Sequence, residues 1–102
     1  RVNTMSKAYL ERLPSWDLTV AQQRAGELGL ELTQARAELL EPARRFYDQY
    51  GFSPSNRPLI SAVAQHLGLE KGRSIYLLSQ FPDTPAKTIA YLAGLPKPKN
   101  CL

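Results

Sequence analysis

The stretch that decides the fold is residues 84–102, TPAKTIAYLAGLPKPKNCL. Its Thr-Pro start is typical of a helix N-terminus, because a proline in the first turn loses no intrahelical hydrogen bond. Gly94 suits the left-handed backbone that ends many helices. Pro96 and Pro98 then exclude further helix, since proline lacks the amide donor. The stretch therefore predicts a last helix and, after it, an extended arm that ends in a penultimate cysteine, Cys101.

Upstream of this stretch, apolar residues recur at helical spacing in four segments, most of them bounded by a glycine. The second segment is the longest and contains Pro42. A proline inside a helix crowds the carbonyl four residues earlier, so we expect a kink or a break near residues 33–40. The predicted helices cover residues 18–28, 33–51, 59–67 and 75–78.

The N-terminal stretch has a different pattern. Residues 2–4 and 9–11 alternate briefly around a polar turn, which predicts two short strands. The predicted fold class is therefore mainly α (α+β): a small helical bundle with a short N-terminal β-hairpin and an extended, flexible C-terminal arm. We expect residues 1–102 to form a single domain, with residues 95–102 as its mobile arm.

Composition excludes several classes of protein. The chain has 102 residues, of which 43% are hydrophobic and 22% charged, as in an ordinary globular domain. No apolar run approaches the roughly 20 residues of a membrane span, and the N-terminus lacks a signal-peptide pattern. One cysteine forms no internal disulfide, and with one histidine it makes a structural zinc site improbable. We expect a cytoplasmic monomer with no membrane contact, cofactor or metal.

Charge is concentrated in the second half of the chain. Residues 1–50 carry seven basic and seven acidic groups, whereas residues 51–102 carry six basic and two acidic groups, which gives the net charge of +4. This half favours anionic partners, either acidic protein surfaces or nucleic acid. A basic surface without a partner is an equally open interpretation.

The position of Cys101 favours a reactive thiol. An arm of polyproline type rises about 3.1 Å per residue, so the thiol would stand roughly 15 Å beyond Pro96. Lys97 and Lys99 are close in sequence and favour the thiolate, which is the nucleophilic form, whereas the carboxylate of Leu102 opposes them. Chain ends also tolerate many residues, so this position alone leaves a neutral role open.

A helix-turn-helix is one alternative for the central region. Residues 59–69 and 74–78 form a helix, a glycine-containing turn and a second helix. The second helix offers few polar side chains that could read bases, although Arg73 stands at its start. Helices joined by a glycine turn also pack together in proteins that bind no DNA. Direct binding of nucleic acid therefore stays open.

Five blocks of sequence carry a resemblance to a known family. They occur in the order and spacing of that family, and the last block, with its Pro-Lys-Pro-x-x-Cys ending, is the most specific. The blocks are RFYDQY (45–50), SPSNRPL (53–59), KGRSIYL (71–77), FPDTPAK (81–87) and AGLPKPKNC (93–101). In these blocks the chain resembles the DsrC/TusE family of sulfur-relay proteins.

The resemblance implies a sulfurtransferase in the carrier sense. Its penultimate cysteine, Cys101 here, would accept a persulfide sulfur and pass it on. Dissimilatory members carry a second cysteine eleven positions earlier, where this chain has Ala90. The chain therefore resembles the single-cysteine, TusE-like branch, which relays sulfur toward 2-thiouridine in tRNA. A DsrC-like carrier or regulator in dissimilatory sulfur metabolism is the alternative.

The resemblance also implies partners. Upstream we expect a sulfur-relay complex of the TusBCD/DsrEFH type, and downstream a tRNA-thiolating enzyme or a sulfite reductase. Five basic residues are candidates for docking the arm or an acidic partner, although several suit solvated helix ends equally well. The candidate site residues are Cys101 as the persulfide acceptor and donor, with Arg57, Lys71, Lys87, Lys97 and Lys99 for binding.

Overall fold

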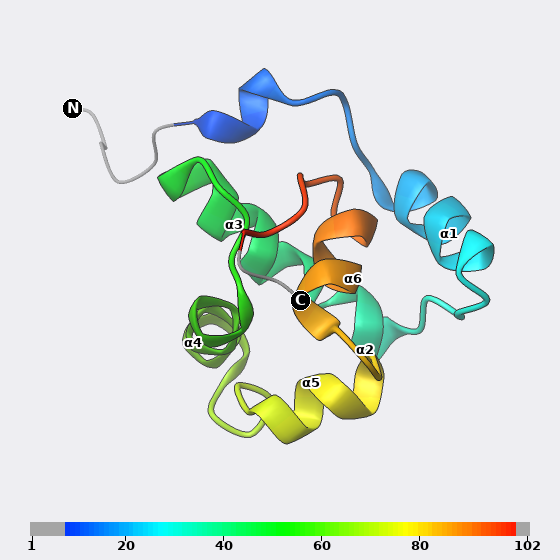
Figure 1. The fold of residues 1–102 in the computed structure, drawn as a ribbon, viewed down its shortest axis with the longest axis vertical. Coiled ribbons are helices and arrows are strands. Elements are labelled where there is room, and N and C mark those ends of the chain that lie inside the picture. Colours follow the sequence, from blue (N-terminus) through cyan, green and yellow to red (C-terminus); the bar gives the residue numbers. More distant parts are fainter. Residues whose placement is uncertain (1–7, 100–102) are drawn as a thin grey trace.

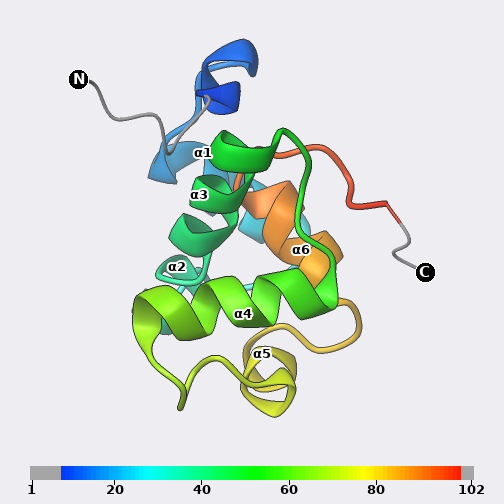
Figure 2. The same cartoon turned by 90° about the vertical axis from the view of Figure 1, so that its left-hand side faces the viewer.

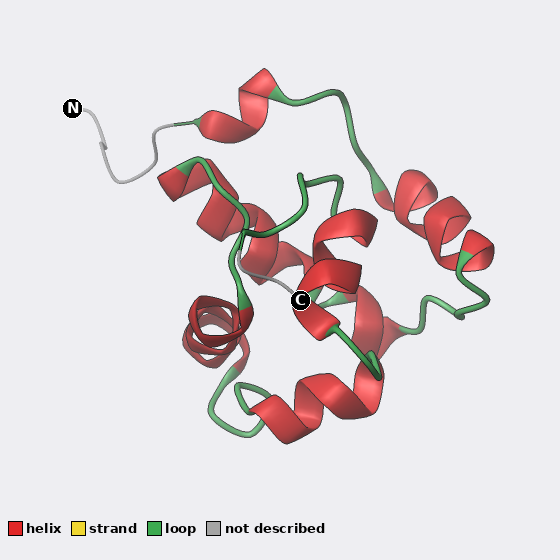
Figure 3. Ribbon diagram, in the orientation of Figure 1, coloured by secondary structure: helices red, strands yellow, loops and turns green. Residues whose placement is uncertain are grey.

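The fold is helical throughout the part of the chain that the structure describes. The computed structural model describes residues 8–99, and it contains no strand within them (Figures 1 and 3). In chain order the helices are η1 (Tyr9–Arg12), α1 (Leu18–Glu27), α2 (Gln34–Ala37), α3 (Leu40–Tyr50), α4 (Asn56–Leu67), α5 (Ser74–Gln80) and α6 (Pro85–Leu92).

The predicted N-terminal β-hairpin, and with it the α+β fold class, was wrong. Its second strand is the 3-10 helix η1, and its first strand, at residues 2–4, lies outside the described residues. Contacts with α3 explain the difference. The Leu10 amide donates to the Asp48 carboxylate at 3.1 Å, and the Tyr9 ring lies against the backbone of Gly51. These contacts with a helix take the place of a partner strand.

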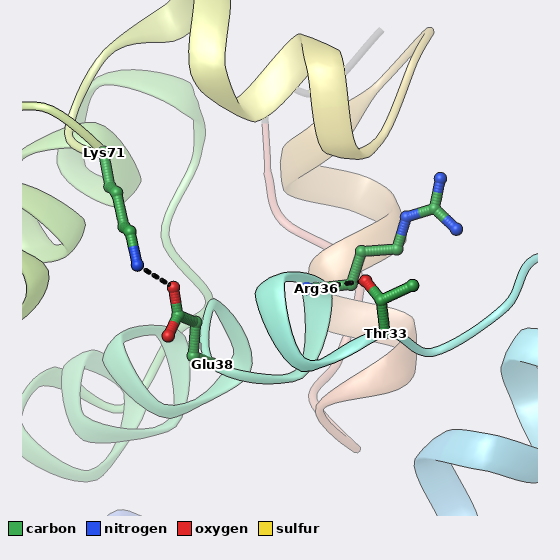
Figure 4. A network of polar contacts seen from close by, with 4 residues as sticks. All are labelled: Thr33, Arg36, Glu38 and Lys71. Atoms are coloured by element: carbon green, nitrogen blue, oxygen red, sulfur yellow. Dashed lines mark hydrogen bonds and ion pairs between the residues drawn. The ribbon is translucent and has the colours of Figure 1, made fainter.

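The predicted break near residues 33–40 is confirmed. The chain forms two helices in this region, α2 and α3, and Glu38 and Leu39 lie between them. Pro42 is the third residue of α3, where a backbone N–H has no intrahelical acceptor. The proline therefore starts the second helix without breaking a hydrogen bond. Thr33 caps α2 by accepting from the amide of Arg36 at 3.2 Å (Figure 4).

The other predicted helices are present with shifted ends. Asp17 caps α1 through the amide of Val20, as expected of an N-cap aspartate. Helix α4 begins three residues before its predicted start, at Asn56, and α5 extends beyond residues 75–78 in both directions. None of the helices within residues 8–99 has the length and apolar content needed to cross a membrane.

Helix α6 lies at the centre of the packing. It contacts α1, α3, α4 and α5, and Figures 1 and 2 show it enclosed by them. Its inward side chains, including Ile89 and Leu92, are fully buried against Leu59 and Val63 of α4 and the other core residues. Because the arm continues directly from α6, the best-packed helix of the domain fixes the start of the arm.

Candidate functional site

Cys101 lies outside the described residues, but the structure describes the chain that leads to it. Helix α6 ends in a Schellman motif around Gly94, which has a φ of +74°. The Leu95 amide donates to the Ala90 carbonyl at 2.9 Å, and the Gly94 amide donates to the Tyr91 carbonyl at 3.3 Å. This turn sets the direction in which the arm leaves the helix.

Four side chains then hold the backbone at the start of the arm. They come from distant parts of the sequence, and each donates a hydrogen bond to a carbonyl oxygen between residues 91 and 96. We call this set the arm-root clamp. The donor and acceptor pairs are Arg24 to Tyr91 (2.7 Å), Trp16 to Leu92 (2.8 Å), Arg44 to Ala93 (2.7 Å) and Ser53 to Pro96 (2.5 Å).

Trp16 and Arg44 are partly buried members of the arm-root clamp that contact each other. The guanidinium of Arg44 lies 4.2 Å from the centre of the Trp16 ring, a cation–π arrangement. Burial lowers the pKa of Arg44, while the carboxylates of Glu41 and Asp48 act in the opposite direction. The Trp16 ring also lies against Gly94, where a Cβ atom would come within 2.5 Å of Trp16 Cδ1. Only glycine fits there.

The arm stays on the domain farther than its sequence indicated. Leu95 is 7% exposed and Pro98 is buried, whereas Pro96, Lys97 and Lys99 are exposed. Figure 1 shows this segment in red, running from α6 to the connection between α3 and α4, where Ser53 lies. Residues 95–98 therefore lie along the helical body.

A groove of about 440 Å³ lies beside this segment. Its lining comes from the end of α1, the outer side of α6 and the arm. We call it the arm groove. It is lined by Leu28, Thr84, Lys87, Thr88, Tyr91, Leu95 and Lys97.

The structure separates the five basic candidates. Lys87 and Lys97, from α6 and the arm, line the same groove. Lys99 is exposed and follows Lys97, a residue of the arm groove, by two positions. Arg57 is exposed at the start of α4 and lines a different pocket. Lys71 is bound to the Glu38 carboxylate, and this hydrogen bond raises the pKa of Lys71 (Figure 4). Only two of the five therefore come together.

Sequence reasoning missed the whole arm-root clamp. Trp16, Arg24, Arg44 and Ser53 are spread over 38 positions of the sequence and share no motif. Their common feature is the backbone that they bind, which sequence spacing does not reveal. The sequence predicted that Gly94 ends the last helix, but it did not predict the close contact between Gly94 and Trp16. Among residues 8–99, no three His, Cys, Asp or Glu side chains lie together as a metal site.

Comparison with known proteins identifies the family. The family described as "DsrC like protein" matches residues 1–102. The chain belongs to this family. Among its DsrC-like relatives, the sulfurtransferase TusE of Sodalis glossinidius is 42% identical over 99% of this chain and 94% of its own length. The sulfurtransferase TusE homolog of Haemophilus influenzae is 43% identical over 99% of this chain and 93% of its own length.

Solved DsrC structures share the fold. The NMR structure of Allochromatium vinosum DsrC matches with a TM-score of 0.78 and 42% identity, over 94% of this chain and 86% of that one. The crystal structure of the oxidized gamma-subunit of the dissimilatory sulfite reductase (DsrC) from Archaeoglobus fulgidus matches with a TM-score of 0.69 and 27% identity. That match covers 100% of this chain and 91% of the other.

These relatives confirm two predictions made from the sequence. The resemblance to the DsrC/TusE family is correct, and so is the expectation of a sulfurtransferase that acts as a carrier in a sulfur relay. A relay carrier works with partner proteins, because it must receive and deliver its sulfur.

The helix-turn-helix alternative gains no support from the surface of α5. This helix exposes Ile75 and Leu78, whose side chains offer no hydrogen bonds to base edges. Arg73 is exposed at its N-cap, but it stands beside this apolar face. The exposed surface of α5 therefore combines these two apolar side chains with Ser74 and Ser79, and it offers few groups that could read bases.

Proposed function

We propose that this chain accepts a persulfide sulfur on Cys101 and passes it to a downstream acceptor. The observation that carries the proposal is the arrangement at the end of the chain. Its only cysteine is the penultimate residue, and it follows a backbone segment that four side-chain hydrogen bonds hold in place. The arm-root clamp presents the last residues to a partner from a fixed starting point.

The chemistry is a pair of sulfur exchanges. The Cys101 thiolate attacks the outer sulfur of a donor persulfide, R–S–SH, and the donor S–S bond breaks as the new one forms. The products are Cys101–S–SH and the donor thiolate, R–S⁻, so atoms and charge balance and no outside oxidant is needed. An acceptor thiolate then attacks the outer sulfur in the same way and releases the Cys101 thiolate.

Nearby cations support the thiolate in this proposal. A free thiol has a pKa of about 8.5, so only a few per cent is ionised at neutral pH. Lys99 is two residues from Cys101 and Lys97 is four, and both are exposed where described. We assign these two lysines to thiolate stabilisation and to partner docking. Arg57 and Lys71 receive no such role, since Arg57 lies in another pocket and Lys71 is engaged by Glu38.

The carrier must exchange sulfur with other molecules. Residue 90, where dissimilatory relatives carry a second cysteine, is an alanine that is only 2% exposed within α6. With a single thiol in the chain, neither an internal disulfide nor an internal trisulfide can form. This favours the TusE-like route toward 2-thiouridine in tRNA over dissimilatory sulfur metabolism.

The proposed setting follows from this route. The donor would be a relay complex of the TusBCD/DsrEFH type, and the acceptor a tRNA-thiolating enzyme, both in the cytoplasm. The chain would act as a monomer, with residues 1–102 as one domain and residues 95–102 as its arm. Within that arm, residues 95–98 form the fixed part and the residues after Pro98 carry the thiol to the partner.

Intact mass spectrometry tests the proposal. Incubation with glutathione persulfide should add about 32 Da, one sulfur atom, to the wild-type chain, and a thiol reductant should remove it. The variant Cys101→Ser should gain no mass. An adduct that persists in Cys101→Ser would contradict the proposal.

The route is tested in cells. In a strain that lacks its own TusE and therefore 2-thiouridine, expression of this chain should restore the modified nucleoside, and Cys101→Ser should not. If sulfur loads onto Cys101 in vitro but no 2-thiouridine returns, the dissimilatory alternative is favoured.

A further inference from the structure

The arm groove combines charge and apolar surface beside the segment that leads to Cys101. We propose that the arm groove binds an acidic peptide segment with an apolar anchor, presented by a protein that exchanges sulfur with Cys101. This inference rests on the proposed function, because it names the partner chemistry that the carrier recognises.

The charge of the arm groove is unbalanced. Lys87 and Lys97 line it, and none of its lining residues within residues 8–99 is an aspartate or glutamate. Glu27 accepts from the hydroxyl of Tyr91, but the guanidinium of Arg24 lies over the same ring and offsets its charge. Neither lysine has a hydrogen-bond or ion-pair partner among the described residues, whereas Lys71 is engaged by Glu38 and Arg45 by Glu41. Two cations from different elements that face one cavity without counter-charges favour an anionic occupant.

The apolar part of the lining favours a peptide. Leu28 is 49% exposed and Tyr91 is 39% exposed, and Leu95, at the base of the arm, lines the same groove. Tyrosine is enriched at protein interfaces, and the exposed leucine beside it adds apolar surface for a residue of a partner. Thr84 and Thr88 add hydroxyl groups that have no recorded partner in the described structure, so they are available to a bound backbone.

The arm groove is continuous with the route to the thiol. Leu95 and Lys97 belong to both, and the arm-root clamp holds the backbone between residues 91 and 96 beside the groove. Cys101 follows Lys97 by four residues, which span at most about 14 Å of extended chain. A partner segment held in the groove therefore keeps its reacting sulfur within reach of Cys101.

Nucleic acid fits the arm groove less well. Binding of a phosphate backbone depends on a track of several cations, and bases stack on exposed aromatic platforms. Here only two lysines are among the described lining residues, and the one aromatic residue among them, Tyr91, has its hydroxyl bound to Glu27 at 2.6 Å. We therefore assign the groove to protein and treat RNA as an outcome of the test.

NMR titration of the full-length protein tests the inference. The probe is a short peptide of alternating glutamate and leucine, compared with a matched peptide in which glutamine replaces glutamate. The glutamate peptide should shift the amide signals of Thr84, Lys87, Thr88 and Tyr91, and the glutamine peptide should bind at least about fivefold more weakly. Raising the salt concentration should weaken only the glutamate peptide.

Charge reversal supplies the matched variants. The double variant K87E/K97E should lose at least about fivefold in affinity for the glutamate peptide, because attraction becomes like-charge repulsion. Arg57→Glu reverses an exposed charge outside the arm groove and should leave that affinity unchanged. Equal losses in both variants would mean that only net charge matters, and that result would overturn the inference.

Two further outcomes separate the inference from the proposed function. Mass gain from glutathione persulfide should be the same in the single variant Lys87→Glu as in the wild type, because a small donor does not need the groove and Lys87 is not one of the lysines assigned to the thiolate. Failure of Cys101 to gain sulfur in either protein would overturn the proposed function whatever the peptides do. Groove shifts with unmodified tRNA, but not with the glutamate peptide, would overturn the protein-docking inference in favour of RNA.

Discussion

The hydroxyl of Ser53 donates a 2.5 Å hydrogen bond to the carbonyl of Pro96, across 43 positions of sequence. Ser53 lies in the connection between α3 and α4, and it is 4% exposed. The bond joins the helical body to the arm at the point where the chain has left α6. It is the last contact of the arm-root clamp before Lys97, so it holds the start of the arm against the helical body.

Replacement of Ser53 by alanine should release this point. The Pro96 carbonyl would lose its donor, and we expect a loss of about 1 kcal/mol in the free energy of unfolding. Hydrogen exchange at the amides of Lys97 and Lys99 should accelerate. Ser55→Ala is the matched control, because Ser55 makes no side-chain cap bond at the start of α4. Unchanged exchange in Ser53→Ala would show that the bond does not hold the arm.

Replacement of Gly94 by alanine should be more damaging than the same change at Gly29. Both glycines follow a helix end with nearly equal φ values, +74° and +73°. An added Cβ meets Trp16 Cδ1 at 2.5 Å in the first case and nothing within 4 Å in the second. We expect about 1 kcal/mol of backbone strain in both variants, and a further 1–3 kcal/mol, roughly, only in Gly94→Ala. Denaturant unfolding of the two variants measures the difference, and equal losses would contradict the contact with Trp16.

Replacement of Arg44 by leucine should destabilise the protein far more than replacement of Arg45. Arg44 donates to the Ala93 carbonyl and lies over the Trp16 ring, and its loss leaves a buried carbonyl unpaired. We expect a cost of about 1–3 kcal/mol. Arg45 is 61% exposed and pairs only with Glu41 within its own helix, so Arg45→Leu should cost at most about 0.5 kcal/mol. The fluorescence of Trp16, the single tryptophan of the chain, reports unfolding beside the arm.

Tyr91 should ionise at higher pH than an ordinary tyrosine. Its hydroxyl donates to Glu27 at 2.6 Å, and this hydrogen bond, with some desolvation and the Glu27 charge, raises the pKa of Tyr91 above 10.0. Because the folded state holds the proton more tightly, the bond stabilises the fold fully below pH 10. That contribution disappears as the pH rises through the raised pKa.

The ultraviolet absorbance of the phenolate measures this shift. Titration of the wild type against Tyr91→Phe isolates the signal of Tyr91, and Glu27→Ala should return its pKa toward 10.0. The stability difference between wild type and Tyr91→Phe should be constant below pH 10 and shrink at higher pH. A Tyr91 pKa that does not move in Glu27→Ala would exclude the hydrogen bond as its cause.

Local sequence predicted most of the helices well. Asp17 and Thr33 each cap a helix through a side-chain bond, Gly94 ends α6, and the break before Pro42 is where proline geometry requires it. All of these signals act within a few residues, through caps, backbone angles and missing donors. The helix ends were less accurate, since packing lengthens helices such as α5 beyond their apolar stripe.

The N-terminal segment shows where such reasoning fails. Brief alternation at residues 9–11 favoured a strand, but a strand needs a partner to satisfy its backbone. In this fold the Leu10 amide is satisfied by Asp48 of α3, and the segment closes into η1. The partner lies 38 positions away, beyond the range of any local pattern.

By itself, the sequence determined where the α-helices after residue 17 form, where the arm begins, that a single thiol stands near its end, and which family the chain belongs to. These follow from local backbone preferences and from motifs that are contiguous in the chain. Only the tertiary structure decided that Trp16, Arg24, Arg44 and Ser53 hold the start of the arm, and that Lys87 and Lys97 share a groove. The physical reason is that a carbonyl at a helix end accepts any donor that packing brings to it, so the sequence carries no motif for that choice.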